Sequence, residues 1–180
     1  MMPLWWLLLW ASSALAFDRN KQAKLSEVLD NVLYTKAGTH EVQSEMVDTA
    51  TRLIAESDAP IRLVIVDSVM ALYRTEFTGR AELADRQQHL GKHLRALAKL
   101  AAEFNLAVVV TNMMTADPGN AMVADAKKPV GGHVLAHAVD TRIFLRKGRG
   151  TQRIAKIFAG PHPEAEATFS ITEKGIVEAE

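Results

Sequence analysis

Two polar side chains follow apolar runs and could act on a bound metal or nucleotide. Asp67 follows Leu63-Val64-Ile65-Val66, and Asn112 follows the run at 107–111. Such runs are typical of strands that helices cover on both faces of a parallel sheet. Ligands of open parallel sheets bind at the carboxyl ends of the strands. An aspartate there can orient Mg²⁺ and its waters beside phosphates, so Asp67 is a candidate catalytic and metal-binding residue.

Simpler explanations exist for both residues. A helix cap or a solvated strand end would explain Asp67 about as well as a metal ligand does. For Asn112, a polar residue that merely ends a strand is the simpler of the two interpretations. Ser68 could suggest a hydrolase, but the nucleophile pattern G-x-S-x-G is absent from the sequence.

A phosphate-binding loop of the form G-x-x-x-x-G-K-[ST] is also absent. The backbone amides and the lysine of that loop would hold the phosphates of a nucleotide. The glycine–lysine pair Gly91-Lys92 lies inside a predicted helix and is followed by His93. We therefore expect that this chain on its own does not bind ATP in the usual way.

Basic residues gather in one stretch, although the 21 basic and 21 acidic residues of the chain cancel. This stretch could contact phosphates or could be an ordinary solvated hairpin. Its residues are Arg142, Arg146, Lys147, Arg149, Arg153 and Lys156. His133 and His137 could share a helix face, but no carboxylate completes a metal site of the H-E-x-x-H type.

The amino terminus has the features of a secretory signal. The apolar stretch within residues 1–17 is too short to span a bilayer, and Ala14-Leu15-Ala16 has the form of a signal-peptidase site. The usual basic segment before it is missing, so a truncated or mispredicted gene product is the alternative. The chain has no cysteine, which excludes disulfides and thiolate metal sites.

Alternating helix and strand patterns place these residues in an α/β fold of 180 residues, a length that suits one domain. Helix periodicity covers 41–57 and 81–104, and strand patterns cover 32–34, 62–67 and 107–111. This order builds a parallel sheet through right-handed crossovers. Residues 115–132 carry two prolines and three glycines and predict a long loop. Strands at 141–146, 153–158 and 167–171 predict an antiparallel meander.

Taken together, several segments resemble the ATPase core of the eukaryotic RecA-type DNA strand-exchange recombinases, most of all the meiosis-specific member. The match runs in order over about residues 28–177. The segments are LDNVLY (29–34), VIVDSVMALYR (64–74), GRAELADRQQ (79–88), FNLAVVVTN (104–112), TADPG (115–119), KKPVGGHVLAHA (127–138), TRIFLRKGRG (141–150) and RIAKIF (153–158).

The resemblance implies a RecA-like core at 28–180, a parallel sheet with helices on both faces plus the meander, after an unmatched leader at 1–27. It implies a filament-forming, ATP- and Mg²⁺-dependent protein of the nucleus that pairs single-stranded with double-stranded DNA in meiotic homologous recombination and DNA repair. The partners would be DNA and other protomers or full-length recombinase. We expect no stable membrane association.

The resemblance also assigns roles to single residues. Asp67 corresponds to the Walker B aspartate, with Ser68 and His137 on the nucleotide side and Asn112 as a second catalytic candidate. The first DNA-binding loop and the following helix correspond to 74–88, and the second loop to 113–131. The implied DNA-binding residues are Arg74, Arg80, Arg86, Lys127, Lys128, Gly131 and Gly132.

Some positions depart from the family pattern. Met113 stands where the family has a glutamine that couples nucleotide to the second loop, and Ala159 replaces an aspartate that caps the neighbour's nucleotide. With the missing phosphate-binding loop, these changes favour an alternative, an ATPase-dead DNA-binding or filament-interaction paralogue. The strand before that loop is also absent, which leaves two strand edges that residues 5–10 could cover.

Overall fold

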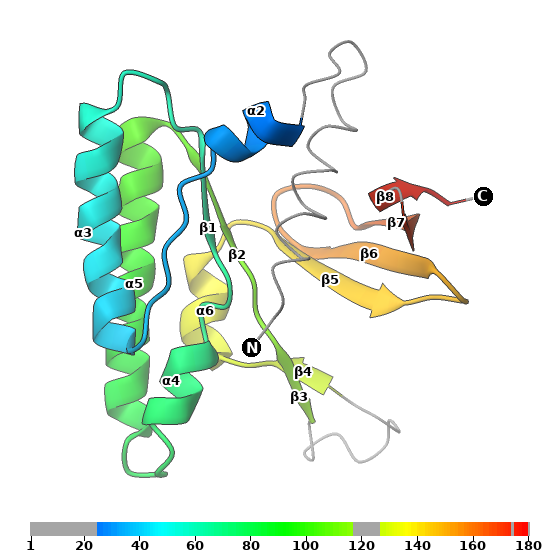
Figure 1. The fold of residues 1–180 in the computed structure, drawn as a ribbon. Helices are drawn as coiled ribbons and strands as arrows, with labels where there is room; N and C mark the ends of the chain where they lie inside the picture. The colour runs from blue at the N-terminus through cyan, green and yellow to red at the C-terminus, as the bar shows by residue number, and fades with distance from the viewer. Residues whose placement is uncertain (1–24, 117–126, 174, 180) are drawn as a thin grey trace. The chain divides into compact units, whose positions relative to one another are not determined.

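The computed structural model describes residues 25–116, 127–173 and 175–179 (Figure 1). The chain divides into two compact units, residues 36–139 and residues 1–35 with 140–180. The hypothesis that residues 5–10 cover a strand edge falls outside the described residues. Within the described ranges, no helix is long and apolar enough to cross a membrane.

The unit at 36–139 combines helices with two small sheets. Its elements in chain order are α3 (His40–Glu56), β1 (Leu63–Val66), α4 (Ala71–Glu76), α5 (Leu83–Phe104), β2 (Ala107–Val110), β3 (Met114–Ala116), β4 (Lys127–Pro129) and α6 (Gly132–Ala138). The α/β class expected from the sequence is confirmed, and the two long predicted helices match α3 and α5.

Local sequence explains where the long helices begin and end. The Thr39 hydroxyl caps α3 by accepting a hydrogen bond of 3.3 Å from the N–H of Val42. Helix α5 ends at Phe104 and is capped by Asn105, whose φ of +49° is left-handed, a conformation that asparagine tolerates better than most residues.

Strands β1 and β2 form the predicted parallel pair, with Leu63 opposite Ala107 and Val66 opposite Val110. Helices α3 and α5 pack on one face of this pair. Val47, Leu97 and Leu100 form the centre of that contact and pack against Val64, Val66, Val108 and Val110. Burial of these apolar side chains is what holds the strands against the helices.

The expectation that both faces of these strands are buried is wrong for the described residues. Leu63, Ile65 and Val109 remain 37%, 43% and 39% exposed. Successive side chains of a strand point to opposite faces, and α3 and α5 cover only the face of Val64 and Val108. The apolar run therefore gives each strand two apolar faces, and α3 and α5 cover only one of them.

A second core joins the end of β1 to three helices. Val69, Met70 and Tyr73 are completely buried against Leu90 and Leu94 of α5 and Leu135 of α6. Because these side chains fix the start of α4 and the start of α6 to the same stretch of α5, the segments that follow β1 and β2 are held close together.

Two expectations about local structure are corrected. The stretch 115–132 is not a loop throughout, because β3 and β4 pair antiparallel, with Thr115 opposite Lys128. The remainder, 117–126, lies outside the described residues. The strand predicted at 32–34 is absent, and Leu33 and Tyr34 are 72% and 71% exposed.

The other unit contains the short helix α2 (Leu25–Asp30) and an antiparallel sheet of order β5-β6-β7-β8. Its strands are β5 (Arg142–Lys147), β6 (Gln152–Ala159), β7 (Ala165–Thr172) and β8 (Gly175–Glu178). The predicted meander is thus confirmed, and β8 is a strand that sequence patterning missed. The N–H of Gln152 donates to the Arg149 carbonyl at 2.9 Å and closes the expected turn between β5 and β6.

Candidate nucleic-acid interface

Asp67 lies directly after β1, at the carboxyl edge of the parallel pair. The N–H of Thr111 donates to the Val66 carbonyl at 3.0 Å, and the N–H of Val69 donates to the Thr111 carbonyl at 3.1 Å. The Thr111 hydroxyl also donates to Oδ1 of Asp67 at 2.5 Å. Two neighbouring strands therefore hold this exposed carboxylate at the edge where the sequence predicted it.

The groups at this edge suit the magnesium side of a nucleotide site. Mg²⁺ binds through one or two carboxylates and keeps several waters, and Asp67 is an exposed carboxylate. Beside it, the buried Ser68 hydroxyl has no hydrogen-bond partner within the described ranges. Asp67 and Ser68 would hold the ion, which would supply positive charge beside phosphates. The chain carries no loop that fits the phosphates themselves.

The side chain of Asn112 has a structural role, because both ends of its amide form hydrogen bonds within the protein. Its amide donates to the Val130 carbonyl at 2.7 Å, and its Oδ1 accepts from the N–H of Met113 at 2.8 Å. The N–H of Val130 donates in turn to the Met113 carbonyl at 3.1 Å. The amide therefore ties together the start and end of segment 113–131.

The two segments expected to bind DNA meet through Arg74 and Met113. The Nη1 atom of Arg74, in the last turn of α4, lies 2.7 Å from Sδ of Met113. Met113 is the position where the sequence departs from the family glutamine. The contact places the last turn of α4 beside the start of segment 113–131, which follows β2.

Arg80 and Arg86 differ in their surroundings. Arg80 is exposed in the turn before α5, which Glu82 braces by accepting from the Gly79 N–H at 2.8 Å. Arg86 is half-buried, and its Nε has no partner among the described residues. The same holds for Oε1 of Gln87, a residue that sequence reasoning did not single out. Unpaired buried polar atoms are uncommon and can indicate a missing ligand.

Gly131 and Gly132 form the tight turn into α6, with φ of +102° and +60°. A Cβ on Gly131 would lie 3.1 Å from Cβ of Leu135 and 3.3 Å from Sδ of Met70. Glycine is therefore required there by conformation and by space. Lys127 and Lys128 are exposed on β4, ahead of this turn.

His137 is exposed in the last turn of α6. Its ring stacks on that of His133, with centroids 6.0 Å apart and planes inclined by 18°. The prediction that these two histidines share a helix face is confirmed.

Most of the basic residues at 142–156 have partners within their own sheet. Arg146 and Lys156 form ion pairs of 3.0 Å with Glu166 and Glu164, respectively. The Arg142 guanidinium lies 4.8 Å from the centroid of the Phe158 ring. Arg153 donates to the carbonyl oxygens of Gly150 and Gln152. These contacts favour the interpretation of a structured hairpin over that of a free phosphate-binding strip.

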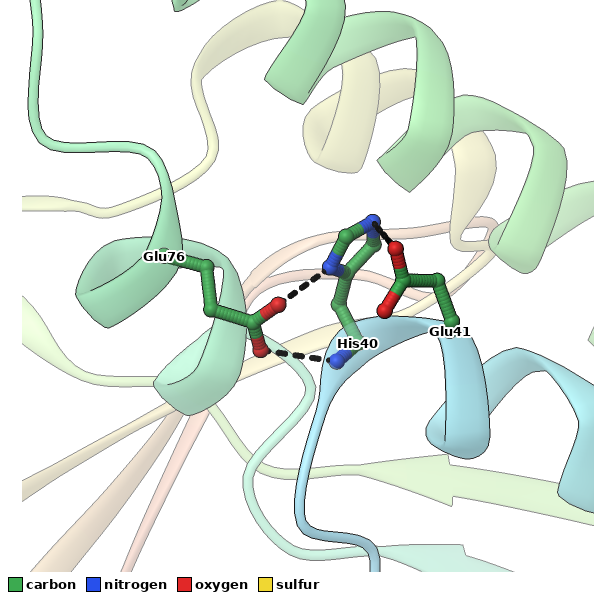
Figure 2. A group of neighbouring side chains, drawn as sticks. All are labelled: His40, Glu41 and Glu76. Carbon is green, nitrogen blue, oxygen red and sulfur yellow. Dashed lines mark hydrogen bonds and ion pairs between the residues drawn. The ribbon is translucent and has the colours of Figure 1, made fainter.

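A polar cluster between α3 and α4 was not predicted from the sequence (Figure 2). Nδ1 of His40 lies 2.5 Å from Oε2 of Glu76, and the His40 backbone N–H donates to Oε1 at 2.8 Å. Burial alone would raise the pKa of Glu76, but these hydrogen bonds from His40 outweigh it and lower the pKa. His40 and Glu76 are 36 positions apart in the sequence, so no short-range sequence pattern predicts their contact.

A second buried histidine, His93 of α5, lies against Gln43 of α3 and the Tyr73 ring of α4. Nε2 of His93 lies 3.2 Å from Nε2 of Gln43, which also donates to the Val69 carbonyl at 3.4 Å. Burial lowers the pKa of His93 to about 4, so the ring is neutral at physiological pH. Nδ1 of His93 has no partner in the described part of the chain.

Comparison with known proteins assigns the chain to a family. The family model described as Rad51 matches residues 15–179. The human meiotic recombination protein DMC1/LIM15 homolog is 56% identical over 155 residues, covering 84% of this chain and 46% of that protein. The meiotic recombination protein DMC1 homologs of Lilium longiflorum and Arabidopsis thaliana are 52% and 50% identical. The alignments cover 86% and 84% of this chain and 44% of each plant protein.

The chain thus spans less than half the length of the curated relatives it matches. The motifs at 64–74 and 79–88, the parallel pair with Asp67 at its edge, and the family match over most of the sequence agree. This chain belongs to the Rad51 family.

Proposed function

We propose that this chain forms the DNA-facing part of the core of a nuclear recombinase that exchanges DNA strands in meiotic homologous recombination and DNA repair. The observation that carries the proposal is the meeting of segments 74–88 and 113–131 beside Asp67, through the contact of Arg74 with Met113. Arg74, Arg80 and Arg86 would bind phosphates, together with Lys127 and Lys128.

ATP dependence would belong to a recombinase of the relatives' full length, of which this sequence spans less than half. Asp67 and Ser68 would serve the magnesium side of a nucleotide, and His137 would approach the nucleotide of a neighbouring protomer in a filament. The phosphates would have to be held by residues that this sequence does not contain. No step of hydrolysis is therefore assigned to this chain.

A second candidate is an ATPase-dead DNA-binding or filament-interaction paralogue. It is supported by Ala159 and by Met113, whose sulfur contacts Arg74 instead of offering an amide. Magnesium- and DNA-dependent ATP turnover by the purified chain tests it. The paralogue predicts no turnover above that of the Asp67→Ala variant, and turnover that this substitution abolishes would contradict it.

Binding of a labelled single-stranded oligonucleotide, followed by fluorescence anisotropy, tests the DNA-facing role. We expect weak binding whose affinity falls steeply from about 50 to about 200 mM salt, because phosphate contacts release counterions. The double variant Arg80→Gln/Arg86→Gln should lower the affinity and reduce the salt slope by about 2, or about 1 for each arginine replaced.

Lys99→Gln is the matched control for that experiment. Lys99 is an exposed cation on the same helix, about 20 Å along its axis from Arg86 at 1.5 Å per residue. The control should leave affinity and slope unchanged. Equal losses in the control and the double variant, or an affinity indifferent to salt, would contradict the assignment of the arginines.

A further inference from the structure

His40 carries a nitrogen that the packing of the fold does not explain. Its side chain is only 8% exposed, and Nε2 has no hydrogen-bond partner among the described residues. The other ring nitrogen, Nδ1, is engaged by Oε2 of Glu76. The Glu76 carboxylate has a structural role, because it joins α4 to the backbone and side chain of His40 at the start of α3.

The unpaired nitrogen points toward a carboxylate. Nε2 of His40 lies 4.0 Å from Oε1 of Glu41, and Figure 2 shows this carboxylate on the opposite side of the ring from Glu76. A hydrogen bond would need a clearly shorter distance. Two ligands of one tetrahedral ion lie about 3.4 Å apart when each bond to the ion is about 2.1 Å long. The Glu41 side chain is 67% exposed and is free to close that difference.

The chemistry of the three groups matches a known arrangement. Histidines that bind metals usually donate the other ring N–H to a carboxylate, which fixes the tautomer and strengthens the ligand nitrogen. Glu76 stands in that position relative to His40. If Nδ1 carries the proton, Nε2 presents a lone pair on the side of Glu41. Imidazole nitrogen with carboxylate oxygen is a donor set typical of Zn²⁺.

A second histidine, His89 of α5, lies beside His40. The ring of His89 packs edge-on against the ring of His40, with centroids 5.1 Å apart and planes at 88°. His89 is exposed, and its ring also lies 5.8 Å from that of Phe77. Water would complete the four ligands.

We propose that His40 and Glu41, with Glu76 as the positioning residue and His89 as the third ligand, bind a divalent transition-metal cation of the Zn²⁺ class. Such an ion would connect α3 to α5 at the point where α4 is attached. The site is separate from the edge at Asp67 and does not depend on the proposed DNA-binding role.

Titration of the metal-free, untagged chain tests the site with two ions. Zn²⁺ binding is measured by calorimetry. Co²⁺ is used as a spectroscopic substitute, because visible absorption distinguishes a protein-bound tetrahedral ion from a hydrated one. We expect one bound ion for each chain and the absorption of a tetrahedral site.

Glu41→Gln should weaken binding at least tenfold, because it replaces a charged ligand on an exposed side chain that the fold does not need. Glu76→Gln should weaken it by about 10- to 100-fold, as removal of such an outer carboxylate does elsewhere. Glu45→Gln is the matched control, since Glu45 is exposed one turn further along α3, and it should bind as the parent does. Circular dichroism of each variant checks that the fold is retained.

Three results would overturn the proposal. The first is no Zn²⁺ binding at about 100 µM metal, which would leave His40 as an ordinary ion-paired histidine. The second is binding by Glu41→Gln within twofold of the parent. The third is loss of binding in His133→Ala but not in Glu41→Gln, which would place the ion on the stacked histidine pair of α6.

Discussion

At the scale of single residues, two buried histidines of this protein have different surroundings. His93 is 2% exposed and is held by Gln43, whereas His40 is flanked by two carboxylates. Burial thus keeps the His93 ring neutral, whereas the His40 ring lies beside the carboxylates of Glu76 and Glu41. The contacts of His93 with Gln43 and of His40 with Glu76 cannot be derived from the sequence, because these partners lie 50 and 36 positions apart.

Replacing His93 should change how stability depends on pH. The pKa is about 4 in the folded chain and about 6.5 when unfolded, so between these values the unfolded state binds more protons. The free energy of unfolding should therefore fall as pH decreases from about 6.5 toward 4, by at most about 1.4 kcal/mol per pH unit from this group. The variant His93→Met should show a shallower dependence.

Urea unfolding between about pH 7 and pH 5 measures this effect. The lowered pKa of Glu76 affects the free energy of unfolding mainly below the ordinary value of 4.5, which lies outside the measured pH range. A His93→Met variant with the same pH dependence as the parent would show that the ring is not held neutral by burial.

The two glycines at the start of α6 should respond differently to alanine. Gly131→Ala should lower stability by about 3 kcal/mol, since its φ of +102° is strained for any side chain and the added methyl meets Leu135. Gly132→Ala should cost only about 1 kcal/mol, because its φ of +60° is left-handed helical and its nearest neighbour is 3.7 Å away. Thermal unfolding compares them, and equal costs would contradict this packing of the turn.

At the scale of elements, sequence patterns predicted the main helices and strands whose apolar residues recur at regular spacing. Helices α3 and α5 and strands β1 and β2 lie where apolar spacing placed them. Patterning failed at 32–34, where three apolar residues form no strand. It also failed at β3 and β4, which have three residues each, those of β4 being two exposed lysines and a proline. Strands that short are specified by their partner and not by their own composition.

The positions of Asp67 and Asn112 were likewise predictable from the ends of apolar runs. What these residues touch was not. The Thr111 hydroxyl on Asp67, the Asn112 amide on Val130 and the Arg74 contact with Met113 each join residues that are 18 or more positions apart. Such contacts follow from how the elements pack.

Neighbouring valines of β2 offer a test of that packing. The side chain of Val108 packs against α3 and α5, whereas Val109 is 39% exposed on the other face of the strand. Val108→Thr should lower stability by about 1 to 2 kcal/mol, because it buries an additional hydroxyl at constant volume. Val109→Thr should change stability by less than about 0.5 kcal/mol. Chemical denaturation measures both, and a larger cost at Val109 would show that its face is covered.

At the scale of the whole molecule, charge does not direct the chain to DNA, because its 21 basic and 21 acidic residues balance. Any affinity for DNA must arise where cations gather without acidic partners. The meander uses much of its basic charge in internal contacts, including the pairs of Arg146 with Glu166 and Lys156 with Glu164. The unit at 36–139 instead presents Arg74, Arg80 and Lys127 at exposed positions in α4, before α5 and in β4.

The central claim is that segments 74–88 and 113–131 together form one DNA-binding surface at the edge marked by Asp67. Hydrogen exchange of the full chain, with and without single-stranded DNA, tests it most directly. The proposal predicts that DNA slows exchange in peptides from both segments together and leaves α3 unchanged. Protection confined to residues 142–156, or to only one of the two segments, would contradict it.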